Sequence, residues 1–220
     1  MHPTASHPQP RKLSLGDRWL SALDGGLRTV FAPVRASRAS PAAGAAKADL
    51  PAAEARESGS LMRVNHVGEI CAQALYQSQA LFSRTDELRR HFEHAAQEEL
   101  DHLAWTADRV AELGTHTSHL PPLWWAGAFA WGSLAGLAGD KWSLGFVVET
   151  ERQVEAHLAS HLDRLPSGDA PSRAIVDQMK REEAEHADAA LAAGAQLLPP
   201  PVQGLMRLAA KVMTTVAHRV

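Results

Sequence analysis

Apolar residues recur at intervals of three and four positions along most of this chain, which is the spacing of amphipathic helices. Four stretches are long enough to form the helices of a bundle, and we expect them at residues 58–81, 86–113, 142–165 and 172–193. Shorter helices are expected at residues 15–34, 123–137 and 202–220, the first of them broken by Gly25 and Gly26. Runs of β-branched residues are sparse. The pattern therefore predicts an all-α protein.

Turn and capping residues separate the long helices. Ser83-Arg84-Thr85 lies between the first two, and Pro166-Ser167-Gly168 lies between the last two. Ser58, Ser60 and Ser172 are candidate N-caps. These breaks divide the bundle into two helical hairpins that are joined by one long crossover.

The first part of the chain has a different composition. Residues 1–14 are polar and contain prolines, and we expect them to be disordered. Residues 35–57 are rich in Ala, Ser and Pro and are expected to form a linker. We therefore predict a flexible N-terminal arm at residues 1–57, with a short helix at 15–34, and a helical-bundle domain at residues 58–220.

The crossover contains an uncharged segment, residues 123–137, that is rich in tryptophan. As a helix it would be roughly 22 Å long at 1.5 Å per residue, which is short of a hydrocarbon core of about 30 Å. Trp favours the membrane–water interface. Two interpretations stay open: a crossover helix buried in the core, or a helix that lies in the membrane interface or lines an apolar channel. The amphipathic tail at residues 202–220 could likewise pack on the bundle or touch anionic lipid, with packing favoured.

Overall composition restricts the classes of partner. The chain has 220 residues, 45% of them hydrophobic, and a net charge of −3, with no basic stripe of the kind that binds nucleic acid. Its single cysteine, Cys71, excludes an internal disulfide. We expect a single domain with a sizeable core and no nucleic-acid partner.

Candidate chemistry is concentrated in two copies of one short pattern. Glu99 and His102 are spaced i, i+3 on one predicted helix, and Glu183 and His186 repeat this spacing on another. Residues at this spacing share a helix face. In an antiparallel hairpin, residues equidistant from the turn lie at one level, and the turns at 83–85 and 166–168 are the midpoints that pair Glu69 with Glu99 and Glu151 with Glu183. A Glu from each of two helices and a Glu-x-x-His from each of two others form a di-iron site in ferritin-like four-helix bundles.

The energetics of burial favour a metal at these residues. Four buried carboxylates without counter-charge would cost many kcal/mol, whereas two divalent iron ions would balance their charge. Oxygen and imidazole ligands without thiolate indicate iron or manganese rather than structural zinc. Cys71 should be part of the apolar core.

Several other polar residues lie near the pattern. His66 could be a ligand or could support one, and His157 could orient ligands or substrate. Asp101 could hydrogen-bond a ligand histidine from outside, or could be solvated like Glu185. For Tyr76, the only tyrosine, a core position is favoured over a redox role.

At Asn65-His66-Val67-Gly68-Glu69, Glu98-Glu99-x-x-His102, Val148-Glu149-Thr150-Glu151 and Glu182-Glu183-x-x-His186, the chain resembles the demethoxyubiquinone hydroxylase family. The resemblance covers about residues 58–220. It implies a ferritin-like bundle with an apolar interfacial helix in the crossover and a C-terminal helix. It also implies six metal ligands, which double as the catalytic residues: Glu69, Glu99, His102, Glu151, Glu183 and His186.

The same resemblance implies a di-iron monooxygenase that uses O2 and NADH-derived electrons to hydroxylate the ring of a demethoxy polyprenyl benzoquinol. The expected partners are this quinol and a membrane lipid surface, with peripheral attachment on the cytoplasmic side of the inner membrane. The resemblance is also compatible with a homo-oligomer or with a complex of ubiquinone-biosynthesis proteins. No Rossmann glycine fingerprint is present for a nicotinamide domain. Two alternatives remain: a ferritin-like iron oxidase or peroxidase, and a non-catalytic lipid-binding bundle.

Overall fold

The computed structural model describes residues 14–46 and 49–220, which form seven α-helices and one short 3-10 helix without any strand. The elements are α1 (Leu15–Phe31), η1 (Pro41–Gly44), α2 (Ala52–Phe82), α3 (Asp86–Glu112), α4 (Pro121–Ala138), α5 (Asp140–Arg164), α6 (Ala170–Ala192) and α7 (Pro200–Ala217). The all-α prediction is confirmed. The disorder expected for residues 1–14 falls outside the described residues, apart from Ser14, which caps α1.

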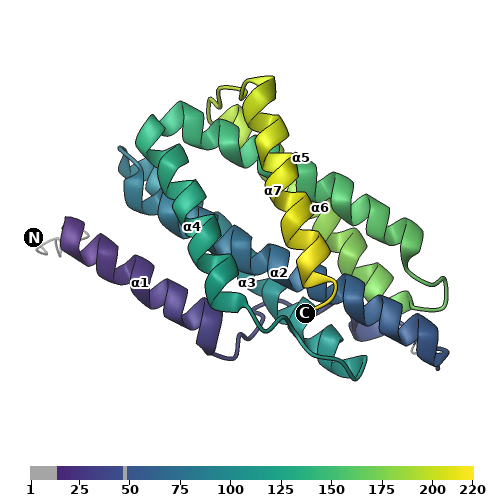
Figure 1. The fold of residues 1–220 in the computed structure, drawn as a ribbon. Coiled ribbons are helices and arrows are strands. Elements are labelled where there is room, and N and C mark those ends of the chain that lie inside the picture. The colour runs from purple at the N-terminus through teal and green to yellow at the C-terminus, as the bar shows by residue number, and fades with distance from the viewer. Residues whose placement is uncertain (1–13, 47–48) are drawn as a thin grey trace, which may run out of the picture.

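The helices α2, α3, α5 and α6 form the bundle as two antiparallel hairpins, α2–α3 and α5–α6, with α4 in the crossover between them (Figure 1). The turns fall where the breaker residues predicted them, at Ser83–Thr85 and around Ser167. This is the ferritin-like arrangement. The helices α4 and α7 lie on one side of the bundle (Figure 1), where both pack against α2 and α5.

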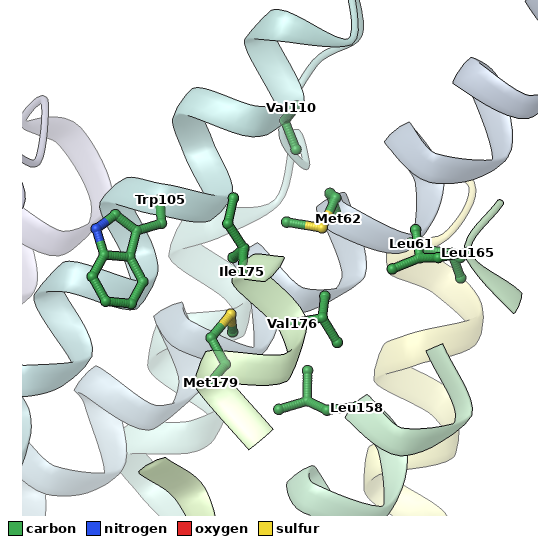
Figure 2. Close-up of a cluster of buried hydrophobic side chains, with 9 residues drawn as sticks. All are labelled: Leu61, Met62, Trp105, Val110, Leu158, Leu165, Ile175, Val176 and Met179. Carbon is green, nitrogen blue, oxygen red and sulfur yellow. The ribbon is translucent and has the colours of Figure 1, made fainter. Parts of the chain in front are cut away.

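The core of the bundle consists of two apolar layers, one towards each end. One layer draws on all four bundle helices and the α5–α6 turn (Figure 2): Leu61, Met62, Trp105, Val110, Leu158, Leu165, Ile175, Val176 and Met179. The other contains Tyr76, Ala80, Leu88, Phe92, Ala95, Leu144, Val147, Val148 and Ala190. On each of the four bundle helices, the predicted site residues lie between these two layers. The candidate site therefore lies in the middle of the bundle, shielded at both ends.

The prediction that the first helix breaks at Gly25 and Gly26 is wrong, because α1 continues through both glycines. The reason is tertiary packing. A Cβ atom on Gly26 would collide with the Trp125 ring of α4, and one on Gly25 would lie 3.1 Å from the Gln77 side chain of α2. The glycines thus allow close approach of α1 to the bundle. Arg18 anchors the other end of α1 by donating to the carbonyl oxygens of Ala80 and Ser83.

Two helix starts also differ from the predictions. The helix α2 begins at Ala52 rather than near Ser58, so Ser58 and Ser60 are interior residues and cap nothing. The N-cap of α6 is Asp169 rather than Ser172. The Asp169 carboxylate accepts a hydrogen bond from the backbone N–H of Ser172. The residues expected to form a linker include η1, which packs against α6.

Large apolar side chains remain exposed on three helices. They are Leu15, Trp19, Leu20, Leu23, Leu27 and Phe31 on α1, Leu123, Leu134 and Leu137 on α4, and Leu205, Leu208 and Val212 on α7. Only Gly132, Ala135 and Gly136 of α4 are buried, so the interpretation of this segment as a buried core helix is wrong. The helix α7 packs through Met206 and Ala217 and leaves its leucines exposed. No helix in the described part of the chain is long and apolar enough to cross a membrane.

The start of α6 is tied to α3 by a buried charge pair. Arg109 donates to Asp169 at 2.8 Å and to the Ser172 hydroxyl at 2.9 Å. Burial alone would raise the pKa of Asp169, but the neighbouring Ser58 hydroxyl, the hydrogen bonds with Ser172 and the charge of Arg109 lower it. The stability that this carboxylate contributes is therefore complete above its ordinary pKa of about 4, and is lost as the pH falls from there through the folded-state pKa.

We expect Asp169→Asn to lower the free energy of unfolding by about 3 kcal/mol at pH 7, because it removes one partner of a buried pair. Urea unfolding at several pH values measures this, and the difference from wild type should shrink below pH 4. The control Asp177→Asn removes an exposed carboxylate of α6 that pairs with Arg181, and should cost less than about 1 kcal/mol. An equal loss for Asp169→Asn at pH 7 and pH 3 would contradict the assignment.

Candidate metal centre

The four bundle helices bring all six predicted site residues together at one level. Glu69 comes from α2, Glu99 and His102 from α3, Glu151 from α5, and Glu183 and His186 from α6. They form two groups, in each of which one ligand atom per residue lies within 4.8 Å of the others. The first group is Glu69, Glu99, His102 and Glu183, and the second is Glu151, Glu183 and His186. Glu183 belongs to both groups.

Two carboxylates lie between the imidazoles. Glu99 places one oxygen 2.9 Å from Nδ1 of His102 and the other 3.0 Å from Nδ1 of His186. Glu183 does the same at 3.6 and 3.5 Å. Glu69 lies on the His102 side, 3.7 Å from Nδ1. Glu99 and Glu183 thus each face both imidazoles, although Glu183 is the one residue that the two ligand groups share.

Burial makes this cluster electrostatically demanding. The four glutamates are at most 3% exposed. Burial raises the pKa of Glu69 and of Glu151 well above the ordinary value. Burial opposes ionisation of Glu99 too, but the neighbouring His102 and His186 hold its pKa well below the ordinary value. At His186 burial would lower the pKa, but the neighbouring Glu183 and Glu99 carboxylates outweigh it and raise the pKa to about 12. The cluster strongly favours bound positive charge.

The donor atoms fit divalent metal ions. Four buried atoms of the cluster make no hydrogen bond, which is rare for buried polar groups: Glu69 Oε2, Glu99 Oε1, Glu183 Oε2 and His186 Nδ1. All donors are carboxylate oxygen or imidazole nitrogen. Cys71 belongs to neither group, and burial raises the pKa of its thiol to about 12. Oxygen-rich sets without thiolate suit iron or manganese.

The outer nitrogens of both histidines contact a glutamate of the opposite motif, which the sequence analysis missed. Nε2 of His102 lies 2.5 Å from Glu182, and Nε2 of His186 lies 3.2 Å from Glu98. Such contacts fix which imidazole nitrogen is free to bind a metal. The signal was present in the sequence, because a second glutamate directly precedes each Glu-x-x-His. Asp101 does not contact a ligand histidine and binds Ser37 and Arg38 instead, while Glu185 is exposed.

Tyr76 occupies the core position that the sequence favoured, and it also contacts a site residue. It is buried in an apolar layer, yet its hydroxyl donates to Oε1 of Glu151 at 2.6 Å. It also lines a narrow, mostly apolar cleft between α2 and α5 that reaches Glu151. The other lining residues are Ala72, Leu75, Gln79, Val147 and Thr150.

The remaining histidines lie outside both ligand groups. His66 is buried, and burial lowers its pKa to about 4. His157 lies against His161, with the two ring centres 4.0 Å apart, and lines a separate cavity of about 280 Å³ with Arg164 and His218. The structure therefore does not bring His157 to the carboxylates.

Comparison with known proteins agrees with this geometry. Residues 56–217 match the model of a family described as "Ubiquinone biosynthesis protein COQ7", so the match includes the four bundle helices and every residue of the cluster. The chain belongs to the COQ7 family. The resemblance noted from the sequence motifs is thereby confirmed.

Relatives of this COQ7 family chain are similar over nearly their full length. A protein of Polaromonas naphthalenivorans is 64% identical over 204 residues, which is 93% of this chain and 98% of the relative. Proteins of Delftia acidovorans and Nitrosococcus oceani are 59% and 56% identical, and each alignment covers at least 93% of this chain and 98% of the relative. All three are named 3-demethoxyubiquinol 3-hydroxylase. The chain is thus an oxidoreductase of a hydroxylase family.

The hydroxyl of Tyr76 should support metal binding through Glu151. We expect Tyr76→Phe to weaken binding of a divalent ion on the Glu151 side by about tenfold, as is usual when a partner of a ligand is removed. Anaerobic titration with Fe(II) measures this. The control Thr150→Val removes a hydroxyl that lines the same cleft and donates to the Phe146 carbonyl oxygen. This variant should bind Fe(II) as tightly as wild type does. Identical affinities for Tyr76→Phe and Thr150→Val would contradict the role of Tyr76.

Proposed function

We propose that this chain is a di-iron, O2-dependent monooxygenase that hydroxylates the ring of a demethoxy polyprenyl benzoquinol in ubiquinone biosynthesis. One observation supports this most directly. Two carboxylate–histidine groups that share Glu183 lie buried in a chain that is 64% identical to a 3-demethoxyubiquinol 3-hydroxylase. The alternative of an iron oxidase finds less support, because the cleft that reaches Glu151 is mostly apolar.

The six site residues would hold the iron. In this proposal Glu69 and His102 serve one ion, Glu151 and His186 serve the other, and Glu99 and Glu183 face both imidazoles. When bound, the two iron ions supply the reductive activation of O2. The protein contributes ligands whose outer contacts are already made, so little reorganisation is needed.

We propose that the quinol ring enters the cleft between α2 and α5, which must widen to admit it because the cleft has no room even for a water molecule in this structure. Leu75 and Val147 give it apolar walls, and Tyr76 and Glu151 lie at its inner end. Apolar walls exclude water from the reacting ring, and Tyr76 holds its hydroxyl proton on Oε1 of Glu151. In the overall reaction, one oxygen atom replaces a ring hydrogen as hydroxyl. The other leaves as water, with two electrons of NADH origin and two protons.

A polyprenyl substrate requires contact with a membrane. The exposed apolar residues of α1, α4 and α7 support the proposal of peripheral attachment, on the cytoplasmic side of the inner membrane. Leu75 of the cleft packs against an apolar cluster that contains Ala135 of α4 and Met206 of α7. We propose that the tail of the quinol follows these apolar side chains from the surface helices towards Glu151.

Iron content tests the centre. Protein purified in mild detergent and loaded anaerobically with Fe(II) should contain about two iron ions per chain. Glu183→Ala should lose most of them, because Glu183 belongs to both groups. Glu185→Ala, which alters an exposed glutamate of the same helix, should retain them. The loaded wild type should then transfer one atom from ¹⁸O2 to the quinol. Wild-type protein that remains metal-free after this loading would contradict the proposal.

Membrane contact can be tested with vesicles of phosphatidylethanolamine and phosphatidylglycerol. We expect the double variant Leu205→Gln and Leu208→Gln to bind about tenfold more weakly or worse, because each leucine loses on the order of 1 kcal/mol of transfer free energy. Both side chains are about half exposed or more, at 49% and 59%, so folding should be unaffected. Co-sedimentation measures binding, with the exposed α3 variant Glu87→Gln as control. Equal binding of all three proteins would argue against α7 as a lipid-contacting helix.

A further inference from the structure

The segment that connects α1 to α2 reaches the candidate metal centre. We call residues 35–45 the connecting segment; they precede the residues that match the family model. The backbone N–H of Ser37 donates to Asp101 of α3 at 2.6 Å. Arg38 donates through Nε to Asp101 at 2.5 Å, and through Nη1 and Nη2 to Glu182 of α6 at 2.5 and 3.1 Å. One guanidinium thus joins the two helices that carry the Glu-x-x-His motifs.

Glu182 is the carboxylate that holds His102. Its Oε2 accepts from Nη2 of Arg38 and lies 2.5 Å from Nε2 of His102. Its Oε1 also accepts from Gln178 at 2.6 Å. With Nε2 of His102 engaged in this way, Nδ1 is the nitrogen that faces Glu99, Glu69 and Glu183. Arg38 therefore acts on the ligand nitrogen through a continuous chain of two contacts.

The connecting segment is fixed in place by packing as well as by charge. The Arg38 guanidinium lies over the Trp105 ring, 5.0 Å from its centre, which is cation–π distance. The Trp105 ring in turn lies 5.5 Å from the His102 ring. Ala36 and Ala42 pack against the apolar layer that contains Trp105. The position of Arg38 is thus set by contacts on both sides of the charge pair.

The equivalent support on the other half of the centre is much looser. Glu98 contacts Nε2 of His186 at 3.2 Å, and its side chain is 41% exposed, against 12% for Glu182. Its other partner is His94, which is 76% exposed. The two halves of an otherwise repeated site therefore differ in how firmly each histidine is held.

We propose that the connecting segment is a positioning element for one metal position, and that Arg38 makes the His102 position bind metal more tightly than the His186 position. This inference rests on the proposed two-metal centre. A planar guanidinium can grip two carboxylates at once, whereas an ammonium is a single point charge. Arg38 is a positioning residue, because it acts on the metal only through Glu182 and His102.

Metal titration of the full-length protein tests this, with cobalt(II) as a spectroscopic probe under anaerobic conditions. Wild type should bind two ions in a tight and a weaker step. Arg38→Ala should weaken the tight step by about 10- to 100-fold and leave the weaker step unchanged. Arg38→Lys preserves the positive charge and the side-chain stem for folding, and it should restore little of the tight step. Arg28→Ala, which alters an exposed arginine of α1 that pairs with Asp24, should change neither step.

The outcomes separate this inference from the proposed function. Wild type that binds no metal would overturn both. Two ions bound with the same two affinities in wild type, Arg38→Ala and Arg38→Lys would overturn the positioning role alone. So would equal weakening of both steps, since a general structural effect would not discriminate between the halves. Glu182→Gln, which breaks the ion pair but retains an acceptor for His102, should reproduce the selective loss if the inference holds.

Discussion

The structure depends on keeping four ionisable carboxylates inside a helical bundle. Glu69, Glu99, Glu151 and Glu183 are at most 3% exposed and lie between two apolar layers. Burying even one uncompensated charge costs several kcal/mol, so this layer requires positive charge. Protons on His102 and His186 can supply part of this positive charge. Metal ions bound to the carboxylate oxygens that make no hydrogen bond can supply the remainder. The apolar layers on either side fix the level at which these charges meet.

The internal repeat makes the centre possible, and the departures from the repeat make its halves different. Each hairpin supplies one isolated glutamate and one Glu-Glu-x-x-His sequence, and the leading glutamate of each sequence contacts the histidine of the other. This exchange links α3 and α6 across the bundle. Among the described residues, only one of the two links is reinforced by a segment from outside the bundle, at Arg38. Symmetry of sequence therefore does not imply equal support for the two metal positions.

Local rules predicted the layout because the information was local. The i, i+3 spacing of Glu99 and His102, together with the turn midpoint near Arg84, was enough to place Glu69 beside them. The passage of α1 through Gly25 and Gly26 depends on Trp125 and Gln77, which are distant in the sequence. Arg38 was missed for the same reason: an Ala- and Pro-rich stretch carries no periodic signal, and its two carboxylate partners lie more than sixty residues away. Tertiary contacts of single residues were beyond the pattern.

The distribution of polarity connects the centre to the surface. The buried glutamates are confined to the middle layer, while the cleft that reaches Glu151 has mostly apolar walls, of which Leu75 packs towards α4 and α7. Those two helices and α1 carry the exposed leucines. A small polar reactant would gain nothing from such a path, because apolar walls offer it no hydrogen bonds. An amphipathic reactant with a polar ring and a long apolar tail matches both ends. The ring would meet Tyr76 and Glu151 while the tail remains among the apolar side chains, and binding energy from the tail could then hold the ring at the metal centre.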